Sequence, residues 1–428
     1  MLERMTKKIS APRGTADILP ADTPVWRDIE DKARRILHNY NYKEIRTPLF
    51  EETGLFKRSL GQTSDVVNKQ LLELASDKRE GFSLRPEGTA SIVRSYIENS
   101  LDRKESISKL FYLGPMFRGE RPQRGRLRQF HQIGAEVIGP ASGHAYIDAE
   151  LITLNVRLLQ EFGLKDFCLK INTLGSCEDK ENFSVQLRKD LKGHLKKLCN
   201  ECQNRFDRNV FRVLDCKNKD CHSIVKSLEI SHAHLSGERQ VYFDYVKKAF
   251  YSLNVDYTLC YDLVRGLDYY THTVFEISAS SLGSQDALSA GGRYNHLVHQ
   301  LGGGEVPAVG FALGIERVIL ALSDVCQVEK NPVSTYIIAL DEPSFVWGFK
   351  ILNILRGKNI SCDMSYRTAS MNSQMRLADK TGSRSVIIIG ESELEREVVT
   401  IKDMQEGTQQ EVSLCNEDYT TLVSQLER

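Results

Sequence analysis

Short apolar runs separated by glycine turns constrain the fold of this chain most strongly. They recur over residues 80–140 and again over residues 260–315. Parallel strands need a long crossover between them, usually a helix, whereas strands joined by short turns pair in an antiparallel way. The pattern therefore predicts an α+β fold with a largely antiparallel sheet flanked by helices, and not a regular βαβ alternation.

Helical segments are predicted on both sides of these strands. Apolar residues recur at helical spacing from Val25 to Tyr40, and Pro24 suits the first turn of that helix. Residues 42–48 follow as a short extended run, and its Pro48 suits an edge or interface strand. Residues from about 178 to 250 are lysine-rich, helical in pattern and cysteine-containing, which predicts a helical insertion.

A second domain is predicted after the pattern breaks around residues 328–334. Apolar strands at residues 336–340 and 386–389 then alternate with helical stretches. We therefore place a first domain at 1–327 and an α/β domain at 332–428. If the second domain binds RNA, the basic residues between 341 and 384 should face it, although a solvated helical face is an equal alternative: Lys350, Arg356, Lys358, Arg367, Arg376, Lys380 and Arg384.

Composition narrows the possible partners. The 57 Lys and Arg residues balance 57 Asp and Glu residues, so any contact with nucleic acid must use local patches. The first ten residues lack the apolar core of a secretory signal, and no apolar run approaches membrane-spanning length. We expect a cytoplasmic protein without a membrane partner, and the ten scattered cysteines fit reduced thiols.

An arginine-rich segment between Phe117 and His131 suggests a partner with phosphate groups. Its glycines, Gly119 and Gly125, predict two strand ends joined by a loop, with Phe117 and Phe130 as stacking surfaces. Guanidinium groups match phosphate oxygens, and the chain has neither a P-loop nor a dinucleotide-binding glycine motif. A surface hairpin and a general RNA contact are the alternatives for these arginines: Arg118, Arg121, Arg124, Arg126 and Arg128.

Three segments resemble, in order, the three motifs of class II aminoacyl-tRNA synthetases. Residues 42–50 resemble motif 1, residues 118–131 motif 2 and residues 310–317 motif 3. Residues 263–270 and 290–294 resemble the signature pair of the histidine-specific members. With residues 11–17 near the start, the resemblance to the histidyl-tRNA synthetase family covers essentially the whole chain.

This resemblance implies a function and an assembly. A class II catalytic domain with a helical insertion would be followed by an anticodon-binding domain, in a homodimer. The chain would activate L-histidine with ATP and Mg²⁺ to histidyl-adenylate. It would then transfer histidine to the 3′ end of tRNA(His) and release AMP and diphosphate.

The resemblance also implies an ATP site. Arg118 would hold the α-phosphate, Arg317 the γ-phosphate and Arg126 a further phosphate oxygen, while Glu120 and Phe130 would orient and stack the adenine. Arg121 and Gln123 are candidates for contacting the acceptor stem of the tRNA. Gly119 and Leu127 depart from the family, which often has aromatic residues at these two places.

A histidine site is implied as well. Glu87, Thr89 and Gln132 would bind the amine, and Glu136, Tyr269 and Tyr270 would surround the imidazole. Arg265 would lie between the histidine carboxylate and the α-phosphate and, with Arg118, would carry catalysis. Because Gln132 and Glu136 are four residues apart, both should point to one face of an extended strand. Taken singly, Glu136 could be an exposed carboxylate and Tyr270 a core aromatic residue.

Four cysteines in the predicted insertion raise the question of a metal. Cys199 and Cys202 form one pair and Cys216 and Cys221 a second, with His222 adjacent, within the range of structural zinc spacing. The second pair is wider than a typical knuckle, and the resemblance implies no structural zinc. Reduced thiols without a metal are therefore the favoured interpretation.

Two other functions are compatible with parts of the pattern. A catalytically silent relative that regulates histidine biosynthesis would share the fold but should lack Arg265 or Arg317 and the second domain. A plain RNA-binding module would leave Glu87, Gln132 and Glu136 without a role. The synthetase activity that the resemblance implies is therefore the favoured function.

Overall fold

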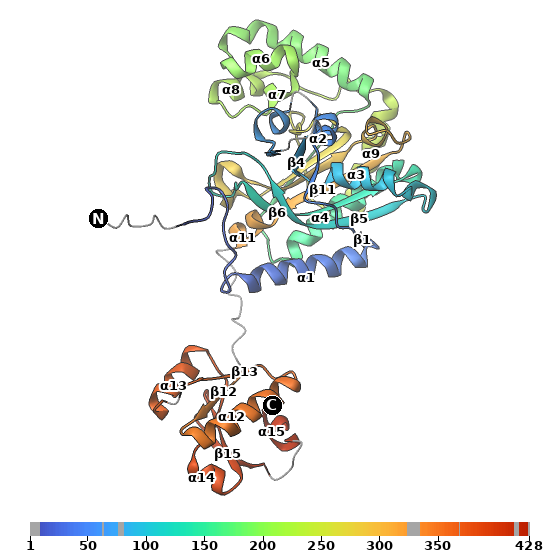
Figure 1. The fold of residues 1–428 in the computed structure, drawn as a ribbon. Helices are drawn as coiled ribbons and strands as arrows, with labels where there is room; N and C mark the ends of the chain where they lie inside the picture. Colours follow the sequence, from blue (N-terminus) through green and yellow to red (C-terminus); the bar gives the residue numbers. More distant parts are fainter. Residues whose placement is uncertain are drawn as a thin grey trace, which may run out of the picture. The chain divides into compact units, whose positions relative to one another are not determined.

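The computed structural model describes residues 9–61, 64–75, 81–322, 334–367, 369–414 and 419–426. The chain forms two compact units, residues 1–327 and 328–428, each with its own sheet (Figure 1). The break predicted at 328–334 lies outside the described residues, except for Ser334.

An eight-stranded sheet dominates the first unit. Neighbouring strands of this sheet are antiparallel except for the two outer pairs, β1 with β5 and β7 with β8. The predicted, largely antiparallel sheet is therefore confirmed. The strands run in the order β1 (Lys43–Glu44), β5 (Ser108–Phe117), β6 (Gln129–Ile138), β11 (Ala308–Gly314), β10 (Ala287–Arg293), β9 (Thr271–Ser278), β7 (Cys168–Thr173) and β8 (Thr258–Leu259).

The two faces of this sheet have different partners. Ile133, Ala135 and Val137 of β6 belong to one apolar core, which also contains α1 (Thr23–Asn39), α4 (Ala145–Glu161), α9 (Gly237–Ser252) and α11 (Ile315–Leu322). The even-numbered residues of β6 face the other way, because side chains alternate along a strand. The second core includes α2 (Thr53–Leu60) and α3 (Thr89–Glu98), and a small sheet of β2 (Phe50–Glu52), β4 (Phe82–Leu84) and β3 (Glu73–Leu74) accompanies them.

A helical insertion joins this second core. It consists of α5 (Cys177–Leu191), α6 (Asn200–Arg208), α7 (Phe211–Leu214) and α8 (Lys219–Ser227), the green helices of Figure 1. Helix α9 falls in the same predicted stretch, but its Phe243, Val246 and Phe250 are buried in the core beneath the other face of the large sheet. Its apolar side therefore supports the sheet and not the insertion.

The extended segment predicted at 42–48 forms a shorter strand than its length suggests. Only Lys43 and Glu44 pair with β5, and the amide of Ile45 donates one more bond, 2.8 Å, to the carbonyl of Phe111. Pro48 lies beyond these bonds and has no amide hydrogen to continue the ladder. Strand β1 ends the sheet, so the predicted edge position is confirmed.

The second unit is an α/β domain. Its sheet runs β13 (Cys362–Met364), β12 (Thr335–Ala339), β14 (Ser385–Ile389), β15 (Val398–Asp403) and β16 (Gln409–Ser413), and β12 and β14 confirm the two predicted strands. Helices α12 (Glu342–Gly357), α14 (Glu391–Glu395) and α15 (Thr420–Leu426) pack with one core and α13 (Met371–Lys380) with a second.

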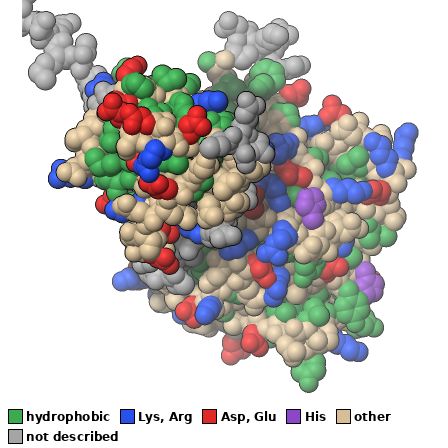
Figure 2. All heavy atoms as spheres, turned by 90° about the horizontal axis from the view of Figure 1, so that it is seen from below, with side chains coloured by type: hydrophobic (Ala, Val, Ile, Leu, Met, Phe, Trp, Pro, Cys, Tyr) green, Lys and Arg blue, Asp and Glu red, His purple; other side chains and the backbone are tan. Residues whose placement is uncertain are grey.

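Charge is mixed on the part of the surface that Figure 2 shows. Basic and acidic side chains are interspersed on the face that Figure 2 shows, in keeping with the balanced composition. Among the described residues, none of the helices combines the length and the apolar character that crossing a membrane requires.

Candidate active site

The even-numbered face of β6 carries the centre of the site. Gln132 and Glu136 lie on this face, as predicted, and both are buried. Glycines stand beside them on the neighbouring strands: Gly114 of β5 pairs with Gln132, and Gly310 of β11 pairs with Glu136. A Cβ atom at Gly310 would lie 1.6 Å from Oε2 of Glu136, so only glycine leaves room for this carboxyl group.

Glu136 is held by two hydroxyl groups. Thr89 donates a 2.7 Å hydrogen bond to Oε1, and Tyr294 donates to Oε2. The pKa of Glu136 is raised to about 8, because burial and, to a smaller extent, the nearby Glu87 raise it by more than these two hydrogen bonds lower it. The site therefore holds a carboxyl group that is protonated at neutral pH.

Glu87 is fixed by the start of α3. Its carboxylate accepts hydrogen bonds from the amides of Thr89 (2.7 Å) and Ala90 (2.9 Å), where the helix end favours negative charge. Burial raises the pKa of Glu87, and the two backbone bonds lower it. Nearby, Oε1 of Gln132 is buried and has no hydrogen-bond partner among the described residues. This amide oxygen can accept a hydrogen bond from a ligand.

Three tyrosines form an aromatic wall. The rings of Tyr269 and Tyr270 are 4.6 Å apart, and those of Tyr269 and Tyr294 are 5.5 Å apart. The pKa of Tyr270 is raised to about 12, because burial raises it by more than Arg265 lowers it. Tyr270 therefore remains a neutral hydroxyl group at physiological pH.

Arg265 has an acidic partner that the sequence did not reveal. Its Nη1 lies 2.6 Å from Oε2 of Glu276, which is on β9. The side chains of Glu276 and Val274 lie on the same face of β9, and Val274 packs in the second core, which is on the side of the sheet where the site lies. This ion pair fixes one side of the guanidinium group.

Arg118 and Glu120 meet at the end of β5. The Nε of Arg118 donates to the carbonyl of Pro86 at 2.9 Å, and its guanidinium lies 5.2 Å from the centre of the Phe130 ring. Glu120 lies 3.2 Å from Arg126 and 3.8 Å from Arg118. The predicted stacking surface and the predicted phosphate ligands are therefore neighbours.

Arg317 reaches this group from α11. It donates to the carbonyls of Gly125 (2.9 Å) and Ala287 (2.6 Å). Burial lowers the pKa of Arg317, repulsion from Arg126 lowers it further, and Glu120 opposes both. Cationic groups from separate stretches of the chain thus lie close together, an arrangement that suits a polyanion.

A hollow of about 510 Å³ opens beside this group. It is lined by Arg13, Gln70, Glu120, Arg121, Pro122, Gln123 and Arg126. The N-terminal segment completes it, because the carbonyl of Gly14 accepts a 2.7 Å hydrogen bond from the amide of Arg128. Arg121 and Gln123 therefore border the same hollow as the proposed adenine and phosphate ligands.

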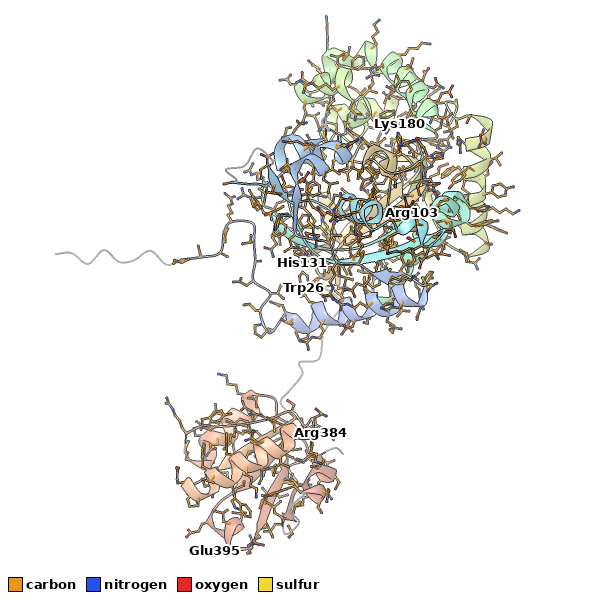
Figure 3. All side chains as sticks on the ribbon, turned by 45° about the vertical axis from the view of Figure 1, so that its right-hand side comes forward. Trp26, Arg103, His131, Lys180, Arg384 and Glu395 are labelled. Atoms are coloured by element: carbon orange, nitrogen blue, oxygen red, sulfur yellow. The ribbon has the colours of Figure 1, made fainter. Side chains whose placement is uncertain are left out.

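Two other residues of the motifs have structural roles. His131, on the odd face of β6, makes a 2.9 Å contact with Glu316 and an edge-on contact with Trp26 (Figure 3). Arg293 is fully buried, pairs with Asp148 and donates to the carbonyl of Ser142 at 2.8 Å. The signature segment 290–294 therefore combines a structural arginine with Tyr294, whose bond to Glu136 the sequence did not indicate.

These features define a class of protein. A largely antiparallel sheet, arginines from motifs 2 and 3 that lie close to one another, and no P-loop in the sequence define the catalytic domain of a class II aminoacyl-tRNA synthetase. Sequence comparison agrees: the model of the family described as "Histidyl-tRNA synthetase" matches residues 14–318, and that of an "Anticodon binding domain" matches residues 336–416.

Individual relatives extend the match over the chain. A histidine–tRNA ligase of Halothermothrix orenii is 42% identical over 410 residues, covering 95% of this chain and 97% of the relative. One of Halalkalibacterium halodurans is 40% identical and covers 98% of both. The crystal structure of apo S. aureus histidyl-tRNA synthetase has a TM-score of 0.81 at 34% identity, covering 98% of this chain and 100% of that one. The chain belongs to the histidyl-tRNA synthetase family and is an aminoacyl-tRNA ligase that joins histidine to tRNA(His).

Proposed function

We propose that this ligase forms histidyl-adenylate on the even-numbered face of the large sheet and then passes histidine to the 3′ end of tRNA(His), releasing AMP and diphosphate. One observation carries the assignment of the site. The buried Glu136, the Gln132 oxygen without a partner among the described residues, and Phe130, against which Arg118 lies, are all on the same face of β6, so an amino acid and a triphosphate can meet there.

ATP is bound by the arginine group. Arg118 holds the α-phosphate, Arg126 and Arg317 hold further phosphate oxygens, and Glu120 and Phe130 orient and stack the adenine. The contact between Arg118 and Phe130 supports this division, because it places a phosphate ligand and a base-stacking surface next to each other. Mg²⁺ accompanies ATP and is held largely by the phosphates, since it prefers oxygen ligands and keeps several waters.

Histidine is recognised by the buried polar groups. Glu87, Thr89 and Gln132 bind the amine, which supplies the donor that the Gln132 oxygen lacks. Glu136 and Tyr270 bind the imidazole, and Tyr269 packs behind them. An analogue without an imidazole leaves these groups unpaired, at a cost of about 1–3 kcal/mol for each group.

Arg265 acts in the transition state. When the histidine carboxylate attacks the α-phosphorus, negative charge grows on the phosphoryl oxygens and diphosphate departs in line. Glu276 fixes one side of the guanidinium at 2.6 Å, which leaves its remaining N–H groups oriented before the reaction begins. Arg118, which belongs to motif 2, stabilises the same negative charge.

The tRNA contacts both units. Arg121 and Gln123, which border the hollow, contact the acceptor stem, and the second unit binds the anticodon. We further propose that the chain works as a cytoplasmic homodimer with a catalytic domain at 1–327 and an anticodon-binding domain at 332–428. The family match supports these proposals.

ATP–diphosphate exchange measured with each amino acid in turn tests the function. We expect exchange that depends strictly on histidine, followed by histidine-specific charging of tRNA. No exchange with any amino acid would favour a silent regulator or an RNA-binding protein. The regulator is disfavoured because Arg265, Arg317 and the anticodon-binding match are all present.

A further inference from the structure

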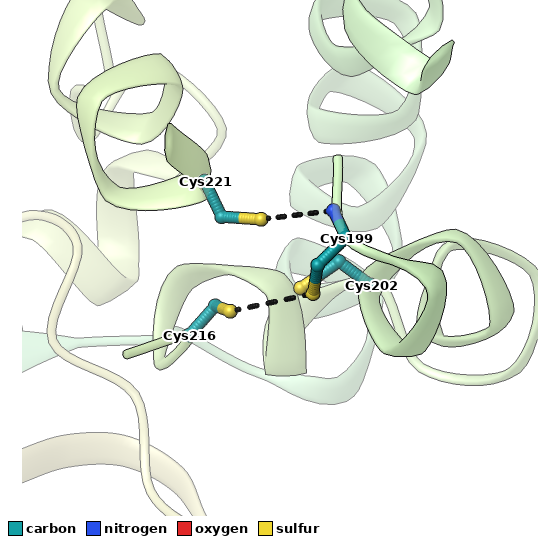
Figure 4. Close-up of side chains that lie close together, drawn as sticks. All are labelled: Cys199, Cys202, Cys216 and Cys221. Carbon is teal, nitrogen blue, oxygen red and sulfur yellow. Dashed lines mark hydrogen bonds between the residues drawn. The ribbon is translucent and has the colours of Figure 1, made fainter. Parts of the chain in front are cut away.

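Four cysteine sulfurs meet inside the helical insertion. Cys199 immediately precedes α6 and Cys202 lies in its first turn, whereas Cys216 follows α7 and Cys221 lies in the first turn of α8. Their four Sγ atoms all lie within 4.8 Å of one another (Figure 4). Two pairs that are separate in the sequence thus form one cluster.

The spacing of the sulfurs fits a tetrahedral metal site. Zinc binds thiolate sulfur at about 2.3 Å, which places the sulfurs of a tetrahedral site roughly 3.8 Å apart. The Sγ atoms of Cys199 and Cys216 are 3.9 Å apart. A disulfide needs a separation of about 2.05 Å, so this pair has the geometry of metal ligands and not that of a covalent bridge.

The surroundings favour a bound cation with thiolate ligands. Cys202 and Cys221 are fully buried among the apolar side chains of the second core. The amide of Cys199 donates a 3.2 Å hydrogen bond to the sulfur of Cys221, a contact typical of atoms that support metal ligands. His222 is exposed and takes no part in the cluster.

The wide spacing of the second pair has a structural explanation. The side chain of Asn218 accepts hydrogen bonds from the amides of Asp220 (2.9 Å) and Cys221 (3.3 Å), which starts α8 and turns the chain between Cys216 and Cys221. Four intervening residues therefore bring both sulfurs to the same point. Reduced thiols are the favoured interpretation of the sequence because the second pair is wide and the resemblance implies no structural zinc. The turn at Asn218 removes the first of these two reasons.

We propose that Cys199, Cys202, Cys216 and Cys221 bind one structural Zn²⁺. Four sulfur ligands close the coordination sphere, which is the arrangement of structural and not of catalytic zinc. The ion replaces the thiol protons, so that binding releases up to four protons to solvent while no electron is transferred.

The site would hold the insertion against the signature loop. Asn209, between α6 and α7, donates a 2.8 Å hydrogen bond to Asp268, and Arg212 of α7 lies against Gly266 and pairs with Asp65 at 2.8 Å. From α5, Lys180 donates to the carbonyls of Asp268 (3.1 Å) and Tyr270 (3.0 Å). The loop that carries Arg265 and Tyr270 is therefore supported by α7 and Asn209, which the metal would hold in place, and also by α5.

Metal analysis of the full-length, untagged chain, purified under reducing conditions without chelator, tests the proposal. We expect about one zinc per chain, released as a mercurial reagent titrates four thiols, and Co²⁺ in its place should show the intense visible absorption of tetrahedral thiolate coordination. Cys202→Ser and Cys221→Ser should lose the metal. Cys177→Ser, which alters an exposed cysteine of the same insertion, should retain it.

The proposal is overturned if the purified chain contains no zinc and Co²⁺ gives no thiolate absorption, if the four cysteines are found as disulfides, or if Cys202→Ser keeps its zinc. Should the variants fail to fold, the metal content and Co²⁺ spectrum of the unmodified chain still decide. Metal removal should also slow histidine-dependent exchange, an effect that rests on the proposed function. The zinc content does not depend on the proposed function, so the zinc proposal and the proposed function can each be refuted separately.

Discussion

Replacing Glu136 with glutamine tests the consequence of burying a carboxyl group. Glutamine has the same shape and can still bond to Thr89 and Tyr294, but it carries no charge. Burial raises the pKa of Glu136 from 4.5 to about 8. Between these values the folded chain holds a proton that the unfolded chain has released, so the free energy of unfolding of the unmodified protein falls as the pH rises.

The size of the effect follows from this shift. Each pKa unit corresponds to about 1.4 kcal/mol, so at pH 7 the charge-related destabilisation amounts to roughly 3 kcal/mol. Glu136→Gln should remove it. The variant should therefore gain stability over the unmodified protein by about 1.4 kcal/mol for each pH unit between pH 5 and pH 7.

Urea unfolding at several pH values measures this gain. The chain has two tryptophans, Trp26 in the first unit and Trp347 in the second, so fluorescence in a Trp347→Phe background reports the first unit. Glu238→Gln, at an exposed position on α9, is the matched control and should show no pH-dependent gain. If the free energies of unfolding of Glu136→Gln and the unmodified protein differ by the same amount at every pH, the reasoning is refuted.

Three further variants examine the site. Gly310→Ala should raise the KM for histidine at least tenfold while the KM for ATP stays within about twofold, because its Cβ would displace Glu136; an unchanged histidine KM would contradict this. Arg118→Ala should raise the KM for ATP about 10- to 100-fold because it removes a charge-assisted hydrogen bond, while the affinity for histidine measured by calorimetry should stay unchanged. An equal weakening of ATP binding and histidine binding would argue against the assignment. Tyr294→Phe removes a bond that lowers the pKa of Glu136, so the pH profile of kcat/KM for histidine should shift toward higher pH; a shift toward lower pH would oppose it.

Alternation along strands made part of the site predictable. Gln132 and Glu136 share a face because side chains repeat every two residues, and this holds whatever the surroundings. The antiparallel sheet followed in the same way from short strands and glycine turns. Local rules of this kind depend only on residues that are near each other in the sequence.

Partners that are distant in the sequence could not be predicted. The bond of Tyr294 to Glu136 and that of Arg265 to Glu276 depend on which strands become neighbours and in which register. Neither acidic residue carries a sequence signal that names its partner. The burial that raises the pKa of Glu136 is likewise a property of the packed sheet and not of its sequence neighbours.

The cysteine cluster and α9 show the same limit. Whether Cys216 and Cys221 approach the first pair depends on the turn at Asn218, whose backbone geometry the spacing does not contain. The sequence of helix α9 did not reveal that it packs beneath the sheet, because the core that a helix joins is a property of the packed fold.

Arg265 is proposed to act on the transition state from the loop between β8 and β9. Rapid-quench measurement of histidyl-adenylate formation by Arg265→Gln, at saturating ATP and histidine, tests it most directly. The rate should fall about 10²- to 10³-fold, as it does when one donor to a developing negative charge is removed, while the histidine Kd changes less than about tenfold. An unchanged rate, or a loss confined to the histidine Kd, would contradict the account.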